Sequence, residues 1–273
     1  MKFSCDKYVL QQAAASAARA AAAKSPIPTL EGLLIEAGAS VRITGYDLKK
    51  AIYTTIDADI PEPGSVLIGA RLFCEMLRRM PDGIVTVEAE NGNVSVKCGK
   101  AAFNLVGLSA DDYPDLPTVE AENGVSLPQD LLKKMINECS FAVSTNESRP
   151  VYMGTLFEIE NNVLTMVSVD GYRLALRREA VEGYGDDCSF IVPGTALSDL
   201  ERLCGDSDER VVLSVGSKHI SFTVGNTVIL SRRLEGDFLN YKKAIPESFR
   251  VTVKTARTDL LEVVERVSLI IDS

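Results

Sequence analysis

The chain repeats itself at a period of about 125 residues, which is too long for a solenoid unit and matches the size of a whole domain. Two short motifs show the repeat. Gly45-Tyr46-Asp47-Leu48 returns as Gly171-Tyr172-Arg173-Leu174, and Asp112-Tyr113-Pro114 returns as Asp237-Phe238-Leu239. A chain with such a repeat folds as similar domains in tandem, and each copy is long enough to bury a core of its own.

The last copy of the repeat is incomplete. Asp130-Leu131-Leu132-Lys133 returns as Asp259-Leu260-Leu261-Glu262, close to the final residue Ser273. We therefore expect two complete domains, residues 1–122 and 123–247, and the opening of a third, residues 248–273. A strand and a helix alone cannot make a domain core, so the third piece needs a partner to pack on.

The order of predicted elements within each copy indicates an α+β fold. Each copy begins with a helix, continues with a block of strands, and then has a second helix and a closing block of strands. Because the strands follow one another without helices between them, their sheets should be antiparallel. The predicted helices are Asp6–Lys24, Ala70–Met80, Gln129–Ser140 and Ala196–Leu203, and the third copy adds a strand at Arg250–Lys254 and a helix at Thr255–Ile270.

Composition narrows the possible functions. The formal net charge of −9 argues against unspecific nucleic-acid binding by the whole surface, although it leaves room for a local basic face. No apolar run approaches the ~20 residues of a membrane span, so no membrane association is expected. The six cysteines form no CxxC pair, which indicates buried thiols in the cytoplasm rather than a zinc site.

The sequence has few residues that suit catalysis. His219 is the single histidine, and it lies in a predicted strand without a nucleophile motif nearby. Neither a Walker loop nor GxGxxG occurs, so no nucleotide cofactor is expected. The acidic pair Asp111-Asp112 lies in a turn-rich stretch, where solvated carboxylates are the ordinary interpretation. We predict a protein that is not an enzyme.

Several motifs resemble those of the DNA polymerase III beta subunits, the bacterial sliding clamps. They are Met1-Lys2-Phe3, Asn146-Glu147-Ser148-Arg149-Pro150 with Gly154 and Leu156-Phe157, Asp170-Gly171-Tyr172-Arg173-Leu174-Ala175, and the Asp112-Tyr113-Pro114 and Gly236-Asp237-Phe238 repeats. The resemblance implies the DNA-clamp fold, in which each domain packs two helices on antiparallel sheets. It also implies a processivity factor for the replicative polymerase, a homodimeric ring that encircles double-stranded DNA without reading its sequence.

In this family the helices line the hole of the ring. Both predicted helices of the first copy are net basic, and Lys24 and Asn146 occupy positions where the family has DNA-contacting residues. For any one basic residue, a solvated helix face is an equally good interpretation. The expected DNA-binding residues are Lys7, Arg19, Lys24, Arg71, Arg78, Arg79, Lys133 and Asn146.

The family also has a pocket for short peptide motifs of the DNA polymerase III alpha subunit, clamp-loader subunits, other polymerases and repair proteins. The resemblance places this pocket at Tyr152, Val169, Gly171, Tyr172, Arg173, Leu174, Leu239, Lys243 and Ala244. Tyr152 and Tyr172 depart from the usual aliphatic residue and histidine, which offers the peptide a flatter apolar contact. Without the resemblance, the turn at 170–174 would be read as an ordinary hairpin.

The resemblance further implies a dimer interface. Phe103 and Leu105 match one side of it, and Leu269 and Ile270 match the partner side, which belongs to the third domain. A homodimer is therefore expected when that domain is complete. The alternative is a clamp fragment that binds partner peptides and does not close a ring.

Overall fold

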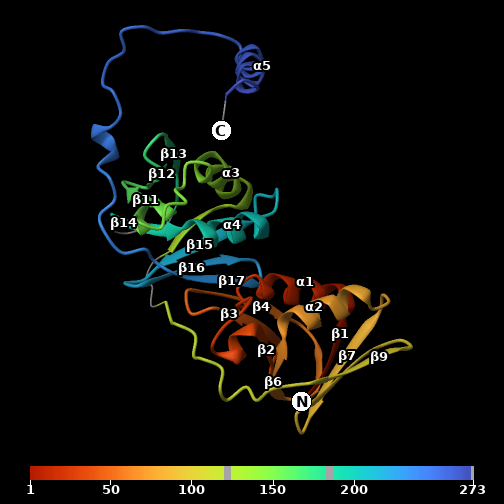
Figure 1. The fold of residues 1–273 in the computed structure, drawn as a ribbon. Coiled ribbons are helices and arrows are strands. Elements are labelled where there is room, and N and C mark those ends of the chain that lie inside the picture. Colours follow the sequence, from red (N-terminus) through yellow and green to blue (C-terminus); the bar gives the residue numbers. More distant parts are fainter. Residues whose placement is uncertain (120–123, 183–186, 272–273) are drawn as a thin grey trace. The chain divides into compact units, whose positions relative to one another are not determined.

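A computed structural model describes residues 1–119, 124–182 and 187–271. The chain forms two compact units, residues 1–238 and 239–273 (Figure 1). The first unit contains the whole of the first predicted copy of the repeat and the second copy up to residue 238, called here the first and second repeats. The predicted domain boundaries themselves stay a prediction.

The first repeat contains two α-helices among its strands. Its elements are β1 (Lys2–Asp6), α1 (Lys7–Ala18), the 3-10 helix η1 (Pro28–Glu31), β2 (Gly32–Ala37), β3 (Val41–Tyr46), β4 (Lys50–Ile56), β5 (Asp59–Glu62), β6 (Gly64–Gly69), α2 (Ala70–Arg79), β7 (Ile84–Glu90), β8 (Asn93–Cys98) and β9 (Ala101–Val106).

The second repeat follows the same order. Its elements are β10 (Gly124–Pro128), α3 (Gln129–Ser140), the 3-10 helix η2 (Pro150–Met153), β11 (Gly154–Glu160), β12 (Val163–Val169), β13 (Leu174–Ala180), β14 (Cys188–Pro193), α4 (Gly194–Leu203), β15 (Arg210–Val215), β16 (His219–Val224) and β17 (Thr227–Arg232).

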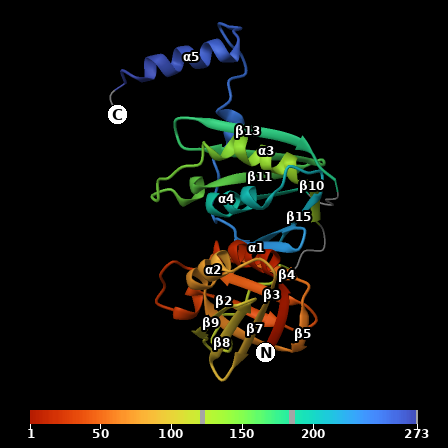
Figure 2. The ribbon, with the colours of Figure 1, turned by 90° about the vertical axis from the view of Figure 1, so that its right-hand side faces the viewer.

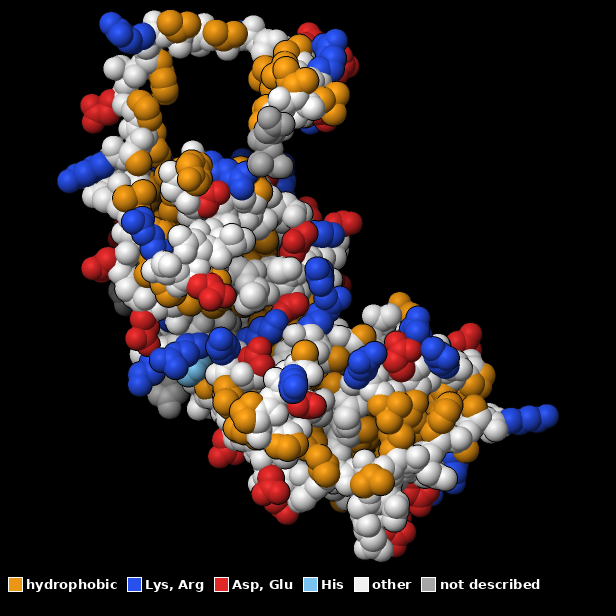
Figure 3. All heavy atoms as spheres, viewed as in Figure 1, with side chains coloured by type: hydrophobic (Ala, Val, Ile, Leu, Met, Phe, Trp, Pro, Cys, Tyr) orange, Lys and Arg blue, Asp and Glu red, His pale blue; other side chains and the backbone are white. Residues whose placement is uncertain are grey.

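The second unit contains the 3-10 helix η3 (Tyr241–Lys243) and the helix α5 (Arg257–Ser268). The predicted strand Arg250–Lys254 is wrong, because residues 251–256 have no regular structure. A strand needs a hydrogen-bonded neighbour, and the described part of the chain provides none for this segment. All residues of α5 are solvent-exposed, and Figure 3 shows the apolar side chains on its surface.

Every strand pair in the three sheets is antiparallel, which confirms the predicted α+β class. The sheets have the orders β5-β1-β7-β8-β9, β10-β15-β16-β17-β4-β3-β2-β6 and β13-β12-β11-β14. The eight-stranded sheet runs through both repeats, because β17 of the second repeat pairs with β4 of the first. In this register Ile229 lies opposite Ile52, and the hydroxyl groups of Thr54 and Thr227 are hydrogen-bonded at 2.9 Å.

Both helix pairs cover the same face of this eight-stranded sheet. Ile52 and Ile56 are four residues apart on β4 and therefore point to the same side. Ile56 belongs to the core under α1 and α2, whereas Ile52 belongs to the core under α3 and α4. Figures 1 and 2 show the two helix pairs next to each other along the unit.

The alanine-rich helix α1 packs very close to β3. A Cβ atom added at Gly45 would lie 2.1 Å from the carbonyl oxygen of Ala17, so only glycine fits there. Ala13, Ala14 and Ala17 are buried on the same helix face. Small side chains on both sides allow the backbones to approach, which explains the alanine content of this segment.

Several predicted elements differ from the observed ones. The first helix ends at Ala18 rather than Lys24, and Asp6 is its N-cap, accepting hydrogen bonds from the Tyr8 and Val9 amides. The strands β1 and β10, which precede the first helix of each repeat, were not predicted. The alternating apolar residues of 51–60 predict a single strand, whereas the structure has two, β4 and β5.

The structure also corrects the register of the repeat. Asp47 and Asp170 hold equivalent turns, since each accepts hydrogen bonds from the amides two and three residues ahead. Gly45-Tyr46-Asp47-Leu48 therefore corresponds to residues 168–171, and the match to Gly171–Leu174 is out of register by three residues. Within the described residues, no helix is both long enough and apolar enough to cross a membrane.

One ion pair connects the two repeats next to the β4–β17 junction. Lys50 Nζ contacts Asp199 Oδ2 of α4, and their side chains are only 15% and 9% exposed. Removing one partner of a buried pair leaves the other charge uncompensated. We expect Lys50→Met to lower the free energy of unfolding by about 3 kcal/mol, as measured by urea denaturation.

The matched control for this prediction is Lys49→Met, at the exposed neighbouring position, which should change stability by less than about 0.5 kcal/mol. The double variant Lys50→Met/Asp199→Leu should be more stable than Lys50→Met alone. Equal stability of Lys50→Met and the unmodified chain would contradict this role for the ion pair.

Candidate functional site

Most of the predicted DNA-binding residues lie in the helices of the first unit or close after them. α1 packs against α2, and α3 packs against α4, so the helices form two adjacent pairs over the sheet. Arg19 directly follows α1, Lys24 lies in the loop beyond it, and Arg71 lies in the first turn of α2. All three are exposed or half-buried, and none forms an ion pair with another described residue.

Other predicted basic residues are already neutralised by carboxylates. Arg78 donates to Glu75 at 2.7 Å, and Arg79 lies 3.6 Å from the same carboxylate. The hydrogen bond from Arg78 is the main cause of a lowered pKa at Glu75, opposed by desolvation. The last turn of α2 therefore carries less free positive charge than its sequence indicates.

Two lysines of the predicted DNA-binding set, one in each repeat, also form ion pairs with carboxylates. Lys7 contacts Asp82 at 3.5 Å, and Lys133 contacts Asp206 at 2.6 Å. The hydrogen bond to Asp206 raises the pKa of Lys133. Their carboxylate partners lie in loops far along the sequence, so no local pattern could have shown these pairs. All eight DNA-binding assignments stay predictions.

Asn146 organises a loop between α3 and η2. Its side-chain oxygen accepts a hydrogen bond from the backbone amide of Ser148 at 3.0 Å. Its own backbone amide donates to Ser144 Oγ at 3.1 Å. The residue is solvent-exposed. These two hydrogen bonds fix the loop, and the side chain adds no charge to its surface.

The turn between β12 and β13 holds most of the predicted peptide pocket. Asp170 accepts hydrogen bonds from the amides of Tyr172 and Arg173, and its second oxygen accepts from Arg173 Nε at 2.7 Å. Gly171 has a φ of +97°, which favours glycine at this position. As a result Tyr172 is fully exposed, while Val169 is buried at the end of β12.

The remaining pocket residues lie in different parts of the chain. Leu174 begins β13, and the Arg173 guanidinium lies 5.7 Å from the ring centroid of Phe141. Tyr152 lies in η2, where its ring meets Phe238 edge-on at 5.5 Å. Leu239, Lys243 and Ala244 belong to the second unit, so the structure describes them separately.

Three of the four predicted interface residues are exposed, and Leu105 is half-buried. β9 is an edge strand that carries Phe103, 37% exposed, beside Leu105, which packs partly on the core. Val106 at the end of the strand is 80% exposed. Leu269 and Ile270, just after α5, are each 84% exposed. An edge strand with exposed apolar side chains is a typical surface for strand pairing with another chain.

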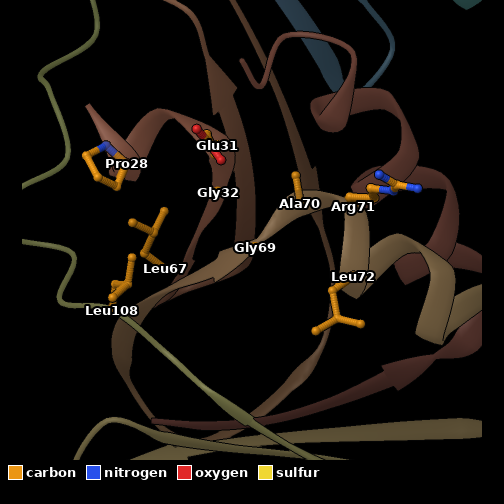
Figure 4. Close-up of a pocket in the computed structure, with 9 residues that line it drawn as sticks. All are labelled: Pro28, Glu31, Gly32, Leu67, Gly69, Ala70, Arg71, Leu72 and Leu108. Atoms are coloured by element: carbon orange, nitrogen blue, oxygen red, sulfur yellow. The ribbon is translucent and has the colours of Figure 1, made fainter. Parts of the chain in front are cut away.

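The first repeat also has a pocket of about 320 Å³ that the sequence did not indicate. Pro28, Leu67 and Leu108 gather on one side of it and Leu72 lies opposite, while the Arg71 side chain extends away from them (Figure 4). Figure 3 shows apolar side chains on this face of the repeat. The lining residues come from several separate segments without a common periodicity, so no sequence pattern marks them.

The catalytic candidates are not assembled into a reactive site. Burial, and then Arg232 and Lys218, lower the pKa of His219 in β16. Burial raises the pKa of Cys5 to about 12 and that of Cys139 to about 11, which keeps these thiols protonated. Among the described residues, no group of His, Cys, Asp and Glu could hold a metal ion.

Comparison with known proteins gives consistent matches along the chain. The family model "DNA polymerase III beta subunit, N-terminal domain" matches residues 1–117, and "DNA polymerase III beta subunit, central domain" matches residues 126–240. The beta sliding clamp of Bacillus subtilis is 32% identical over 282 residues, covering 99% of this chain and 74% of the relative. That of Halalkalibacterium halodurans is 31% identical, with the same coverage.

The solved structures that resemble this chain belong to the same family of proteins. A putative DNA polymerase III beta subunit from Eubacterium rectale superimposes with a TM-score of 0.96 at 30% identity, covering 100% of this chain and 76% of that one. The sliding clamp of Pseudomonas aeruginosa, solved bound to griselimycin, gives 0.93 at 26% identity, covering 98% and 74%. The chain thus spans about three quarters of the length of these proteins.

The Asp170 turn generates a pH-dependent prediction. The amides of Tyr172 and Arg173 and the Arg173 side chain lower the pKa of Asp170, so they favour its charged form. The turn should stay intact above the ordinary aspartate pKa of about 3.9 and loosen only as pH falls through the lowered value. An NMR titration of the Tyr172 and Arg173 amide shifts should therefore have a midpoint below about 3.9.

The variant Asp170→Asn keeps one acceptor oxygen and removes the charge, so it should abolish this titration while keeping the amide shifts near their neutral-pH values. A midpoint at or above that of an ordinary aspartate would contradict the hydrogen-bonded turn.

Proposed function

Since the chain belongs to the family of DNA polymerase III beta subunits, the bacterial sliding clamps, we propose that it serves DNA replication as a processivity factor. In this proposal it encircles duplex DNA and tethers the polymerase, and it catalyses no reaction itself. The observation that carries the proposal is the single helix-covered sheet face shared by both repeats. Arg19 ends α1, Lys24 lies in the loop that follows and Arg71 lies in α2, and none of them forms an ion pair with another described residue.

The charge distribution suits a protein that slides. Retention by encirclement needs no base contacts and no tight grip, because the topology of a ring prevents dissociation. A few exposed basic side chains supply sequence-independent contacts to phosphates, while the overall charge of −9 limits unspecific binding elsewhere. The ion pairs at Arg78, Arg79, Lys7 and Lys133 moderate the attraction further.

The peptide-binding part of the proposal rests on the turn at 170–173. Three hydrogen bonds fix the turn that carries Tyr172 and leave its ring fully exposed, and aromatic side chains are enriched in binding hot spots. The P. aeruginosa clamp was solved bound to griselimycin, which supports a ligand-binding surface in the family. We propose that this surface takes short motifs of polymerases, clamp-loader subunits and repair proteins.

Replacing two unpaired basic residues tests the DNA-facing assignment. Lys24→Gln with Arg71→Gln should reduce the slope of log binding constant against log salt by about 0.9 for each phosphate that is no longer neutralised. Fluorescence anisotropy with a labelled duplex measures this slope. The control Lys49→Gln with Lys218→Gln has the same charge change at exposed turns between strands, outside the four helices, and should leave the slope nearly unchanged. Equal slopes for both double variants would contradict the assignment.

Replacing the exposed tyrosine tests the peptide-binding assignment. Griselimycin should bind the chain, and Tyr172→Ala should weaken binding by about tenfold, the effect of a typical aromatic anchor. Tyr8→Ala, which removes a 66% exposed aromatic side chain from α1, is the control. Calorimetric titration measures the griselimycin affinity of both variants. An unchanged affinity in Tyr172→Ala would contradict the peptide-binding assignment.

The alternative is a clamp fragment that binds partner peptides without closing a ring. It gives the same calorimetric result but differs in solution mass. The ring requires two copies, so light scattering should give twice the chain mass of 29.6 kDa. A single-chain mass at every concentration would favour the fragment.

A further inference from the structure

We propose that two copies of this chain join head to tail, with the edge strand β9 of one copy pairing with the edge strand β13 of the other. Within the described residues each of these strands has a neighbour on one side only, because β9 ends the five-stranded sheet and β13 ends the four-stranded one. The inference rests on the ring of the proposed function, and it names the residues that join one copy to the next.

The β4–β17 junction inside the first unit serves as the template for this contact. The turns at Asp47 and Asp170 are equivalent, so β13 of the second repeat corresponds to β4 of the first. The hairpins β8–β9 and β16–β17 each have a two-residue turn, so Ala101 at the start of β9 corresponds to Thr227 at the start of β17. The edges β9 and β13 therefore hold the positions of β17 and β4, but they lack the pairing.

Burial shows that one side of β9 is unused. Four of the six residues of β17 are buried, whereas four of the six residues of β9 are exposed. Ile229 of β17 is fully buried opposite Ile52, but the equivalent Phe103 of β9 is 37% exposed. The same register places Phe103 opposite Ala175 of the other copy, so a large side chain faces a small one. Pairing would remove the apolar surface of Phe103 from water.

The charges at the junction are repeated as well. Lys50 contacts Asp199 of α4 across the β4–β17 junction, and Lys50 corresponds to Arg173. Helices α2 and α4 each have ten residues and follow a strand directly, with Glu75 and Asp199 as their sixth residues. The basic position is thus basic in both repeats, and the acidic position is acidic in both. The template pairs Glu75 of one copy with Arg173 of the other.

Both side chains have free hydrogen-bonding capacity for this pair. Arg78 and Arg79 contact Glu75 through Oε2, at 2.7 and 3.6 Å, and Oε1 accepts no hydrogen bond from a described residue. Arg173 donates to Asp170 through Nε, while its two Nη groups donate to no described residue. The Glu75 and Arg173 side chains are 47% and 59% exposed. The contact would therefore join two existing pairs into a network of alternating charge.

One contact of the template is not repeated. Arg177 and Ala101 hold the positions of Thr54 and Thr227, so the hydrogen bond between those two hydroxyl groups has no equivalent. We therefore expect the contact between copies to be weaker than the junction inside the first unit. Each copy carries one β9 and one β13, so the contact is head to tail and can repeat until a ring closes.

Charge reversal tests the proposal on the full chain. Glu75→Arg and Arg173→Glu should each raise the dissociation constant for self-association by roughly tenfold or more, measured by light scattering over a concentration series. An equimolar mixture of the two variants should associate as the unmodified chain does. In every mixed contact an arginine faces a glutamate, whereas contacts between identical variants bring like charges together. The controls are Glu62→Arg, at the opposite edge of the β9 sheet, and Lys218→Glu, at an exposed turn, and both should leave association unchanged.

The results separate this junction from the ring itself. Unchanged association in Arg173→Glu would overturn the junction and leave the ring, and it would favour the partner contact expected at Leu269 and Ile270. A mixture that does not associate, with the melting temperatures of both variants unchanged, would also overturn the junction. A single-chain mass of the unmodified chain at every concentration would remove the ring of the proposed function together with the junction.

Disulfide cross-linking tests the register without changing charge. The template places Ala102 of one copy opposite Leu176 of the other, in the way that Val228 faces Tyr53. Residues directly opposite each other on paired strands are close enough for a disulfide. Mixed Ala102→Cys and Leu176→Cys chains should form a covalent pair in oxidised glutathione. Asn104→Cys with Leu176→Cys, two residues out of register, should give roughly fivefold less. Equal yields would overturn the proposed register.

Discussion

The pairing of β4 with β17 is the interaction on which the rest of the first unit depends. It converts two repeated domains into one eight-stranded sheet, and it places both helix pairs over the same face of that sheet. The Thr54–Thr227 hydrogen bond and the Lys50–Asp199 ion pair lie along the junction and fix its register. A shared helix face requires this register, because a slip of one strand by one residue would put Ile52 and Ile229 on opposite faces of the sheet.

The two repeats use the same turn for different purposes. Asp47 and Asp170 hold equivalent turns, so Lys50 and Arg173 are equivalent residues. In the first repeat, Lys50 reaches across the junction to Asp199 and stabilises the chain. In the second repeat, Arg173 pairs with Asp170 of its own turn and leaves Tyr172 exposed. The equivalent basic side chain thus joins the two repeats in one copy and closes its own turn in the other.

The sequence predicted the repeat and the fold class correctly, but it did not predict which distant residues form ion pairs with each other. The period, the α+β class and the helix Gln129–Ser140 followed from turn residues and apolar patterns, and the structure confirms the class and the helix. The short strands β1 and β10 were missed because each leads directly into a helix without a turn between them. The carboxylates that neutralise Lys7 and Lys133 lie about 75 residues away in the chain, and local patterns carry no information on such contacts.

The β4–β17 junction also has a consequence for how the chain is made. Thr54 and Thr227 are 173 residues apart in sequence, so the edge of β4 emerges from the ribosome long before its neighbour exists. At synthesis rates of roughly 5–20 residues per second, this wait is on the order of 10 to 30 s. During that time the first repeat presents an open strand edge, which is a template for wrong pairing with other nascent chains. The interaction that unites the first unit therefore leaves an unpaired strand edge in the growing chain until β17 has been made.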